Sequence, residues 1–299
     1  MPLPPGRSIG YGAGMTVRVV TDSTAYLPAE LSTSAGLDVV GLTVTVSGRE
    51  GREGRDVSPQ DVARALSERR APVTTSRPSP AEFTEVYRRL LDEGATGIVS
   101  VHLSSRLSGT YDSALLAAEE FDGRVRVVDS ASAGLGLGMV ALAASQVAAA
   151  GGDLETVRTA ALAASERVTT LFYVDTLEFL RRGGRINAAQ ALVGTAFAVK
   201  PILHVAHGEV VLKEKVRTAG RALARLADLA VEAAGESDVD IAVQHLGASD
   251  RATALFDALL ARLGGRVGDR YLSEVGAVVA AHTGPGVIGV TVHRRPDNA

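Results

Sequence analysis

Short apolar runs rich in β-branched residues alternate along the first half of the chain with longer stretches rich in Ala and Leu. The short runs predict strands and the longer stretches predict helices, because turn-forming residues bound each of them. Strands are expected at residues 17–21, 39–46, 97–103 and 124–129. Helices are expected at residues 58–70, 79–93, 110–120, 135–150 and 153–167, and residues 47–57 are expected to form an exposed loop. This alternation is typical of an α/β fold, with a mainly parallel sheet and helices on both faces.

The rhythm changes near residue 165. Apolar runs then follow one another more closely: VTTLFYV, PILHV, EVVLKE, DIAVQH, VGAVVAA and VIGVTVH. Each predicts a strand, with helices near residues 221–234 and 251–263. Only Ala206-His207-Gly208 separates PILHV from EVVLKE, which predicts an antiparallel hairpin and therefore a mixed sheet.

We therefore predict two α/β domains, at residues 17–165 and 166–299, with a ligand tunnel between or beside them. Residues 1–16 are rich in Gly and Pro and have no apolar core of a signal peptide. They are expected to be a disordered extension, or to precede a translation start at Met15.

Composition excludes several classes of function. The 299 residues include 31 Lys+Arg and 34 Asp+Glu, and a net charge of −3 argues against a nucleic-acid-binding domain. Cys is absent, so neither a disulfide framework nor a Cys-based metal site is expected, and a cytoplasmic location is indicated. The apolar stretches are too short for membrane insertion. No metal-ligand spacing of His, no Walker A sequence and no G-x-S-x-G elbow is present.

Three polar clusters follow predicted strands and are candidates for a ligand site. One contains Asp22 and Ser23, the next contains Ser105 and Ser108, and the third ends at Ser130. In open α/β sheets ligands bind beyond the carboxyl ends of the strands. Each cluster alone is better explained as a helix cap, but three at one sheet edge make a shared pocket more likely.

Four further segments carry candidate chemistry. Two prolines constrain the hydroxyls of Thr75 and Ser76, which could bind a ligand or simply lead into a helix. Arg185 follows a Gly pair in a cationic turn that could contact an anion, dock a phosphate-bearing partner or be solvated. Arg217 and His282 are individually more typical of a surface residue and a structural residue.

Taken in order, these segments resemble the DegV family of bacterial fatty-acid-binding proteins, from about residue 17 to residue 292. The matching segments combine into an ordered set that is more specific than any one of them. They are VTDST at 20–24, TS-x-PS at 75–79, LSS-x-LSGTY at 103–111, VDS at 128–130, GGRI at 183–186, KPI at 200–202, RT at 217–218 and HTGPG at 282–286. The resemblance implies a two-domain DegV-like fold.

The resemblance also implies a function. Family members carry the lipid of a bacterial fatty acid kinase, whose separate ATP-dependent subunit phosphorylates the bound fatty acid to an acyl phosphate. By resemblance, the fatty-acid carboxylate is bound by Thr75, Ser108, Arg217 and His282. Additional pocket or partner contacts are expected from Ser76, Ser105, Asp22, Ser23, Ser130 and Arg185. Arg77 stands where the family often has Gln.

Apolar burial is expected to dominate affinity for such a ligand. Roughly fourteen methylenes offer about 11 kcal/mol before association costs, so polar groups would set the orientation of the carboxylate. On this hypothesis the chain needs no cofactor and no catalytic residue of its own, because the partner kinase performs the chemistry. Its contact with membranes would be limited to a transient one at the surface.

Two alternatives remain open at this level. A serine-dependent acyl hydrolase or acyltransferase would use Ser108 or Ser105, with His282 as base. A nucleotide or sugar-phosphate binder would use the Gly- and Ser-containing loops after the strands.

Overall fold

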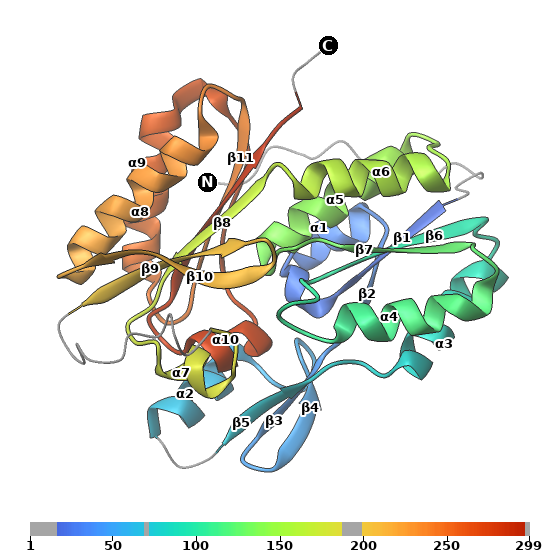
Figure 1. Cartoon of the computed structure of the whole chain (residues 1–299), viewed down its shortest axis with the longest axis horizontal. Coiled ribbons are helices and arrows are strands. Elements are labelled where there is room, and N and C mark those ends of the chain that lie inside the picture. Colours follow the sequence, from blue (N-terminus) through green and yellow to red (C-terminus); the bar gives the residue numbers. More distant parts are fainter. Residues whose placement is uncertain (1–16, 69–71, 187–198, 297–299) are drawn as a thin grey trace.

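A computed structural model describes residues 17–68, 72–186 and 199–296, and Figure 1 shows its arrangement. The N-terminal half forms a four-stranded sheet in the order β2-β1-β6-β7, with every neighbouring pair parallel. Its strands are β1 (Val17–Asp22), β2 (Leu37–Val40), β6 (Gly97–His102) and β7 (Val125–Asp129). All six residues of β6 are buried, as expected for a central parallel strand that is covered on both faces.

Helices cover both faces of this sheet (Figure 1). On one face α5 and α6 pack with side chains such as Val19 and Val99, and on the other α3 and α4 pack with Val20 and Ile98. The helices beside this sheet are α1 (Ala29–Ser34), α3 (Pro80–Asp92), α4 (Thr110–Ala118), α5 (Leu135–Ala149) and α6 (Leu154–Ser165). Short 3₁₀ turns follow β1 (Ser23–Ala25) and α4 (Glu119–Phe121).

The C-terminal half forms a six-stranded mixed sheet in the order β10-β9-β8-β13-β11-β12. Only β11 and β12 run parallel, and the β9–β10 hairpin turns at His207 and Gly208 as predicted. The strands are β8 (Val168–Tyr173), β9 (Lys200–Ala206), β10 (Glu209–Val216), β11 (Val239–His245), β12 (Val267–Glu274) and β13 (Ile288–Arg294). The predicted fold class, α/β with a parallel sheet followed by a mixed sheet, is confirmed.

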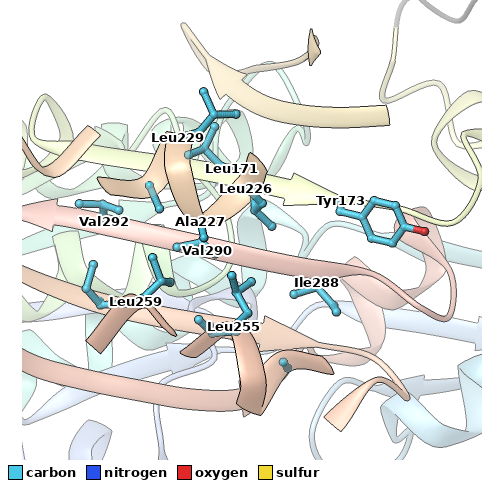
Figure 2. Packing of buried hydrophobic residues seen from close by; sticks show 14 of the residues in the cluster. Leu171, Tyr173, Leu226, Ala227, Leu229, Leu255, Leu259, Ile288, Val290 and Val292 are labelled. Atoms are coloured by element: carbon cyan, nitrogen blue, oxygen red, sulfur yellow. The ribbon is translucent and has the colours of Figure 1, made fainter. Parts of the chain in front are cut away.

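One face of the mixed sheet packs against α8 (Ala219–Ala234) and α9 (Ser249–Leu263). Figure 2 shows this core, in which Leu226 of α8 and Leu255 of α9 lie near Val290 and Leu171 of the strands. Alternate residues along β13 therefore point into this core, and the residues between them face the opposite side of the sheet.

That opposite side faces a third, three-stranded antiparallel sheet in the order β4-β3-β5. Together with three short helices, it lies at the bottom of Figure 1. These elements are β3 (Thr43–Val46), β4 (Arg49–Arg52), β5 (Val73–Ser76), α2 (Pro59–Glu68), α7 (Glu178–Arg182) and α10 (Ala277–Thr283). Leu42, Val44 and Val62 share an apolar cluster with Phe172 and Leu203 of the mixed sheet, so the two halves of the chain are joined here.

Two expectations about residues 39–57 were wrong. The single strand predicted at 39–46 is interrupted at Gly41 and Leu42, and its two parts, β2 and β3, belong to different sheets. The loop predicted at 47–57 contains β4, which pairs with β3 through a tight turn where Ser47 and Gly48 have positive φ. An edge strand made of Arg, Glu and Gly carries no apolar alternation, so the hydrophobic pattern does not reveal it.

Two further differences concern the C-terminal half. The run VGAVVAA was predicted to be a strand, but its residues from Ala277 onward form α10. A short apolar run does not distinguish a buried helix from a buried strand, and here the run packs as a helix against α2 and α7. The polar edge strand β12 was not predicted. The predicted extension at 1–16 lies outside the described residues.

Candidate functional site

A cavity of about 440 Å³ lies between the mixed sheet and the three-stranded sheet. Its volume falls within the range typical of small-molecule sites, roughly 300 to 1,000 Å³. The walls are mainly apolar, with side chains from both halves of the chain. They include Leu42, Leu103, Phe172, Leu180, Val205 and Val287. A cavity with such walls favours a ligand that is largely hydrocarbon.

Four separate segments contribute Thr75, Ser76, Arg77, Ser108, Arg185 and His282 to the polar part of the lining. Thr170, Gln244, Thr283 and Thr291 also line the cavity. The Thr75 Oγ1 atom lies 2.9 Å from His282 Nε2, which joins β5 to the last turn of α10. Arg185 Nε donates to the Leu107 carbonyl at 3.2 Å, and this places the guanidinium beside the loop that carries Ser108. Thr75, Ser76, Ser108, Arg185 and His282, all expected from the sequence, therefore share one cavity.

Arg185 brings an unpaired positive charge into the cavity lining. Its side chain is half-buried and donates to the carbonyls of Leu107 and Gly183. Among the residues that the structure describes, no carboxylate forms an ion pair with it. Burial lowers the pKa of Arg185 below its ordinary value, but a guanidinium remains charged at neutral pH. The lining therefore attracts an anion.

His282 is neutral at physiological pH. Burial, and secondarily the charge of Arg185, lower its pKa to about 4. Its Nδ1 atom is buried and has no hydrogen-bond partner in the described part of the chain. A Cβ atom at Gly183 would lie 2.4 Å from this Nδ1, so the first glycine of the Gly183-Gly184 pair provides the space for the imidazole.

We expect His282 to stay neutral until the pH approaches 4. Its pKa in the folded protein lies below the unfolded value of about 6.5, so the unfolded chain takes up the proton first. The contribution of His282 to the free energy of unfolding is therefore present above pH 6.5 and lost as the pH falls toward 4. A ¹⁵N NMR titration of the imidazoles checks this value, with His282→Gln to assign the signal. An imidazolium signal from His282 at pH 6 would contradict it.

Helix α10, which presents His282, is anchored at its other end by Glu53. The Glu53 carboxylate is 7% exposed and accepts hydrogen bonds from Ser23 Oγ at 2.5 Å, the Tyr26 hydroxyl at 2.9 Å and the Val278 amide at 2.7 Å. The Val279 amide donates to the Tyr26 hydroxyl at 3.1 Å. Burial raises the pKa of the Glu53 carboxyl, and its hydrogen bonds oppose this rise. Ser23, a predicted site residue, thus supports the helix and does not line the cavity.

Asp22 and Ser130 are structural in this fold and lie outside the cavity lining. Asp22 is fully buried, accepts from the Leu103 amide at 3.0 Å and lies 3.0 Å from His102 Nδ1. Ser130 is buried and donates to the Ser132 carbonyl at 3.3 Å. The Asp22 contacts join the carboxyl ends of β1 and β6, and the Ser130 contact lies within the loop after β7, so a ligand or partner contact of either residue stays a prediction.

Ser105 and Arg217 also lie outside the lining. The Ser105 amide donates to Asp129 Oδ2 at 3.2 Å, and Arg217 is exposed directly after β10. A direct contact between Arg217 and a ligand carboxylate therefore stays a prediction. Glu53 and Tyr26 were not predicted, because a lone acidic residue in a charge-rich segment carries no signal of burial.

The described chain contains neither a helix long and apolar enough to cross a membrane nor a group of three or more His, Asp and Glu side chains arranged for a metal ion.

Comparison with known proteins identifies relatives over nearly the whole chain. A DegV domain-containing protein of Streptomyces coelicolor is 53% identical over 279 residues, covering 93% of this chain and 99% of the relative. A fatty-acid-binding DegV family protein of Thermus thermophilus superposes with a TM-score of 0.88 at 38% identity, covering 94% of this chain and all of that one. DegV of Bacillus subtilis, a fatty-acid-binding protein, gives 0.85 at 31% identity with the same coverage. Since the DegV family model also matches residues 16–295, the chain belongs to the DegV family.

Proposed function

We propose that the cavity holds a long-chain fatty acid and that the chain presents the carboxylate to a separate ATP-dependent kinase subunit. The observation that carries this proposal is an apolar cavity whose polar lining residues include an unpaired guanidinium, a neutral imidazole and hydroxyls. The fatty-acid-binding relatives from Thermus thermophilus and Bacillus subtilis support the ligand class.

The acyl chain would lie along the apolar walls, with its carboxylate at Arg185. A desolvated carboxylate needs donors, and the strongest are charged groups such as a guanidinium. The hydroxyls of Thr75 and Ser108 would supply the remaining hydrogen bonds. The acyl chain supplies most of the binding free energy, and these polar groups fix the position of the carboxylate oxygen that reacts.

The Thr75–His282 pair would direct one of these donors. His282 Nδ1 has no described partner and lies against Gly183, which favours the tautomer with the proton on Nε2. A buried ring nitrogen that accepts no hydrogen bond costs less free energy than a buried N–H group that finds no acceptor. In this tautomer Nε2 donates to Thr75 Oγ1, and the Thr75 hydroxyl hydrogen is free to point at the carboxylate.

The chemistry itself would belong to the partner. One carboxylate oxygen attacks the γ-phosphorus of ATP, the new O–P bond forms, and the bond from that phosphorus to ADP breaks. The carboxylate is already ionised at neutral pH, so the carrier needs no general base. Its residues bind and orient the nucleophile.

The geometry does not favour the hydrolase alternative. Ser108 Oγ lies 2.9 Å from Thr110 Oγ1, whereas His282 Nε2 is engaged with Thr75. The described chain also places no carboxylate on His282 Nδ1 to orient the ring, as a Ser-His-Asp arrangement requires.

Arg217 would act from outside the cavity. Because it is exposed and does not line the cavity, we assign its implied role to contact with the kinase or the outer edge of the head group. Ser76 would contact the ligand in the cavity, and Ser105 would contact the partner at the adjoining surface.

Native mass spectrometry of the purified protein tests the ligand class. We expect one fatty acid per chain, released by denaturing extraction. Arg185→Gln should weaken rebinding of the extracted fatty acid by about tenfold or more, because a desolvated charge-assisted hydrogen bond is lost.

Arg217→Gln is the matched control and should rebind the lipid within about threefold of wild type, since apolar burial and Arg185 are unchanged. An empty protein that also fails to take up added fatty acids would refute the proposed function. Fatty-acid binding without acyl-phosphate formation in the presence of a fatty acid kinase and ATP would refute the presentation step alone.

A further inference from the structure

Arg77 places a second guanidinium at the opening of the cavity. The residue follows β5, lines the cavity and is exposed, so it lies where the cavity meets solvent. Its Nη1 atom lies 3.4 Å from the Gly109 carbonyl oxygen. A Cβ atom at Gly109 would lie 1.9 Å from the same Nη1, so the guanidinium rests directly on this glycine, next to Ser108. Pro78 restricts the backbone of Arg77 to extended conformations and so limits where its side chain can go.

The acidic side chains of Glu82 and Glu209 are engaged by other cations. Glu82 of α3 pairs with Arg52 and closes a capping box with Ser79. In the adjoining loop, Arg106 pairs with Glu209 at 3.6 Å. Arg77 itself has no ion pair with a carboxylate anywhere in the described ranges, and its hydrogen bond to Gly109 does not neutralise its charge.

The cavity lining therefore contains two positive charges, Arg185 and Arg77, that pair with no carboxylate of the described residues. A fatty-acid carboxylate carries only one negative charge, and the half-buried Arg185 is sufficient to neutralise it. A phosphate monoester carries about −1.5 to −2 at pH 7 and offers three oxygens to a planar guanidinium. The charge at the opening thus fits a phosphorylated head group better than a carboxylate.

We infer that Arg77, with the hydroxyls of Ser76 and Ser108, forms a subsite for the phosphoryl group of a phosphorylated acyl chain. The inference rests on the proposed function and extends it from substrate to product. When the carboxylate oxygen gains the phosphoryl group, Arg185 keeps the acyl end while Arg77 binds the new charge. The product is then held more tightly than the substrate until an acyl-transfer reaction consumes it.

Calorimetric titration of the delipidated protein with two ligands of equal chain length tests the subsite. The ligands are hexadecanoate and hexadecyl phosphate, a stable monoalkyl phosphate. Wild type should bind the alkyl phosphate at least about tenfold more tightly than the carboxylate, as expected for one added charge-assisted pair. Arg77→Gln should remove this preference while changing hexadecanoate affinity less than about threefold. Arg77→Lys should keep part of it, because a point charge lacks the bidentate geometry.

Arg106→Gln is the matched control. It removes an exposed guanidinium from the adjoining loop that is paired with Glu209 and does not line the cavity, so the preference should be retained. Inorganic phosphate should bind at least about a hundredfold more weakly than hexadecyl phosphate, because it lacks the apolar chain. Equal affinity for both would place the phosphate site outside the cavity and overturn the inference.

The remaining outcomes separate the two proposals. Suppose that wild type binds hexadecanoate, and that Arg77→Gln either lowers the affinity for both ligands equally or changes neither affinity. The subsite is then refuted, and the fatty-acid proposal stands. If wild type binds neither ligand, the fatty-acid proposal is refuted, and the subsite that rests on it is refuted as well.

Discussion

Replacing Gly289 with phenylalanine is expected to weaken binding of a long acyl chain by roughly a hundredfold while the protein remains folded. Gly289 lines the cavity from β13, on the same face of the strand as Val287 and Thr291. A Cβ atom here would meet only Phe172 Cβ at 3.6 Å and the Leu171 carbonyl at 3.7 Å, which are ordinary contacts. The backbone therefore tolerates a side chain, and an aromatic ring would occupy the space that the acyl chain needs.

The expected loss of affinity follows from the displaced methylenes. Excluding four of them removes about 3 kcal/mol, which is roughly a hundredfold in affinity. Displacement of a fluorescent fatty acid measures the loss, and circular dichroism with thermal unfolding confirms the fold. Gly289→Ala is the matched control and should bind within about threefold of wild type, because it adds a single carbon at ordinary contact distance. Wild-type affinity in Gly289→Phe would mean that the acyl chain lies elsewhere.

Glu53→Ala should lower the free energy of unfolding by about 3 kcal/mol or more, and the melting temperature by roughly 6 to 12 °C. The substitution leaves three donors without their acceptor: Ser23 Oγ, the Tyr26 hydroxyl and the Val278 amide. Each unsatisfied buried group costs about 1–3 kcal/mol, less where water enters the space. Glu50→Ala, an exposed position of β4, is the control and should change stability by less than about 0.5 kcal/mol.

The same variant should disturb the far end of α10. The Val278 and Val279 amides at the start of this helix depend on Glu53 and Tyr26, and His282 lies at its end. Loss of this anchor should loosen the contact between His282 and Thr75 and move the His282 pKa up toward its ordinary value. An unchanged melting temperature together with an unchanged His282 titration would show that water replaces the carboxylate at no cost.

Hydrophobic pattern predicted the strands that carry several apolar residues and failed for two edge strands that are rich in charged residues. Strand β6 is buried along its whole length because helices cover both faces of its sheet, and β1 and β7 place Val side chains on the same covered faces. Strands β4 and β12 are edges with charged side chains, so nothing in their composition separates them from loops. The run that forms α10 is too short for its period to be decisive, and packing against α2 and α7 determines its conformation.

The site shows the same division. The ordered motifs selected Thr75, Ser108, Arg185 and His282, which line one cavity although Thr75 and His282 are 207 residues apart in sequence. Polar residues after parallel strands were harder to interpret, because a strand end needs caps whether or not a ligand binds. Asp22 illustrates this, since its oxygens serve Thr24 and Leu103. Glu53 is the opposite case: no motif in the sequence selected it, yet elements distant in sequence bury its carboxylate, which then anchors the start of α10.

The position of β13 has a consequence for biosynthesis. This strand follows every other described strand in sequence, yet it lies inside the mixed sheet between β8 and β11. It also supplies Gly289 and Thr291 to the cavity wall. The four-stranded sheet can form while the ribosome is still translating, but the mixed sheet is split until β13 emerges. On the proposed function, a nascent chain would therefore bind a fatty acid only after β13 has been translated.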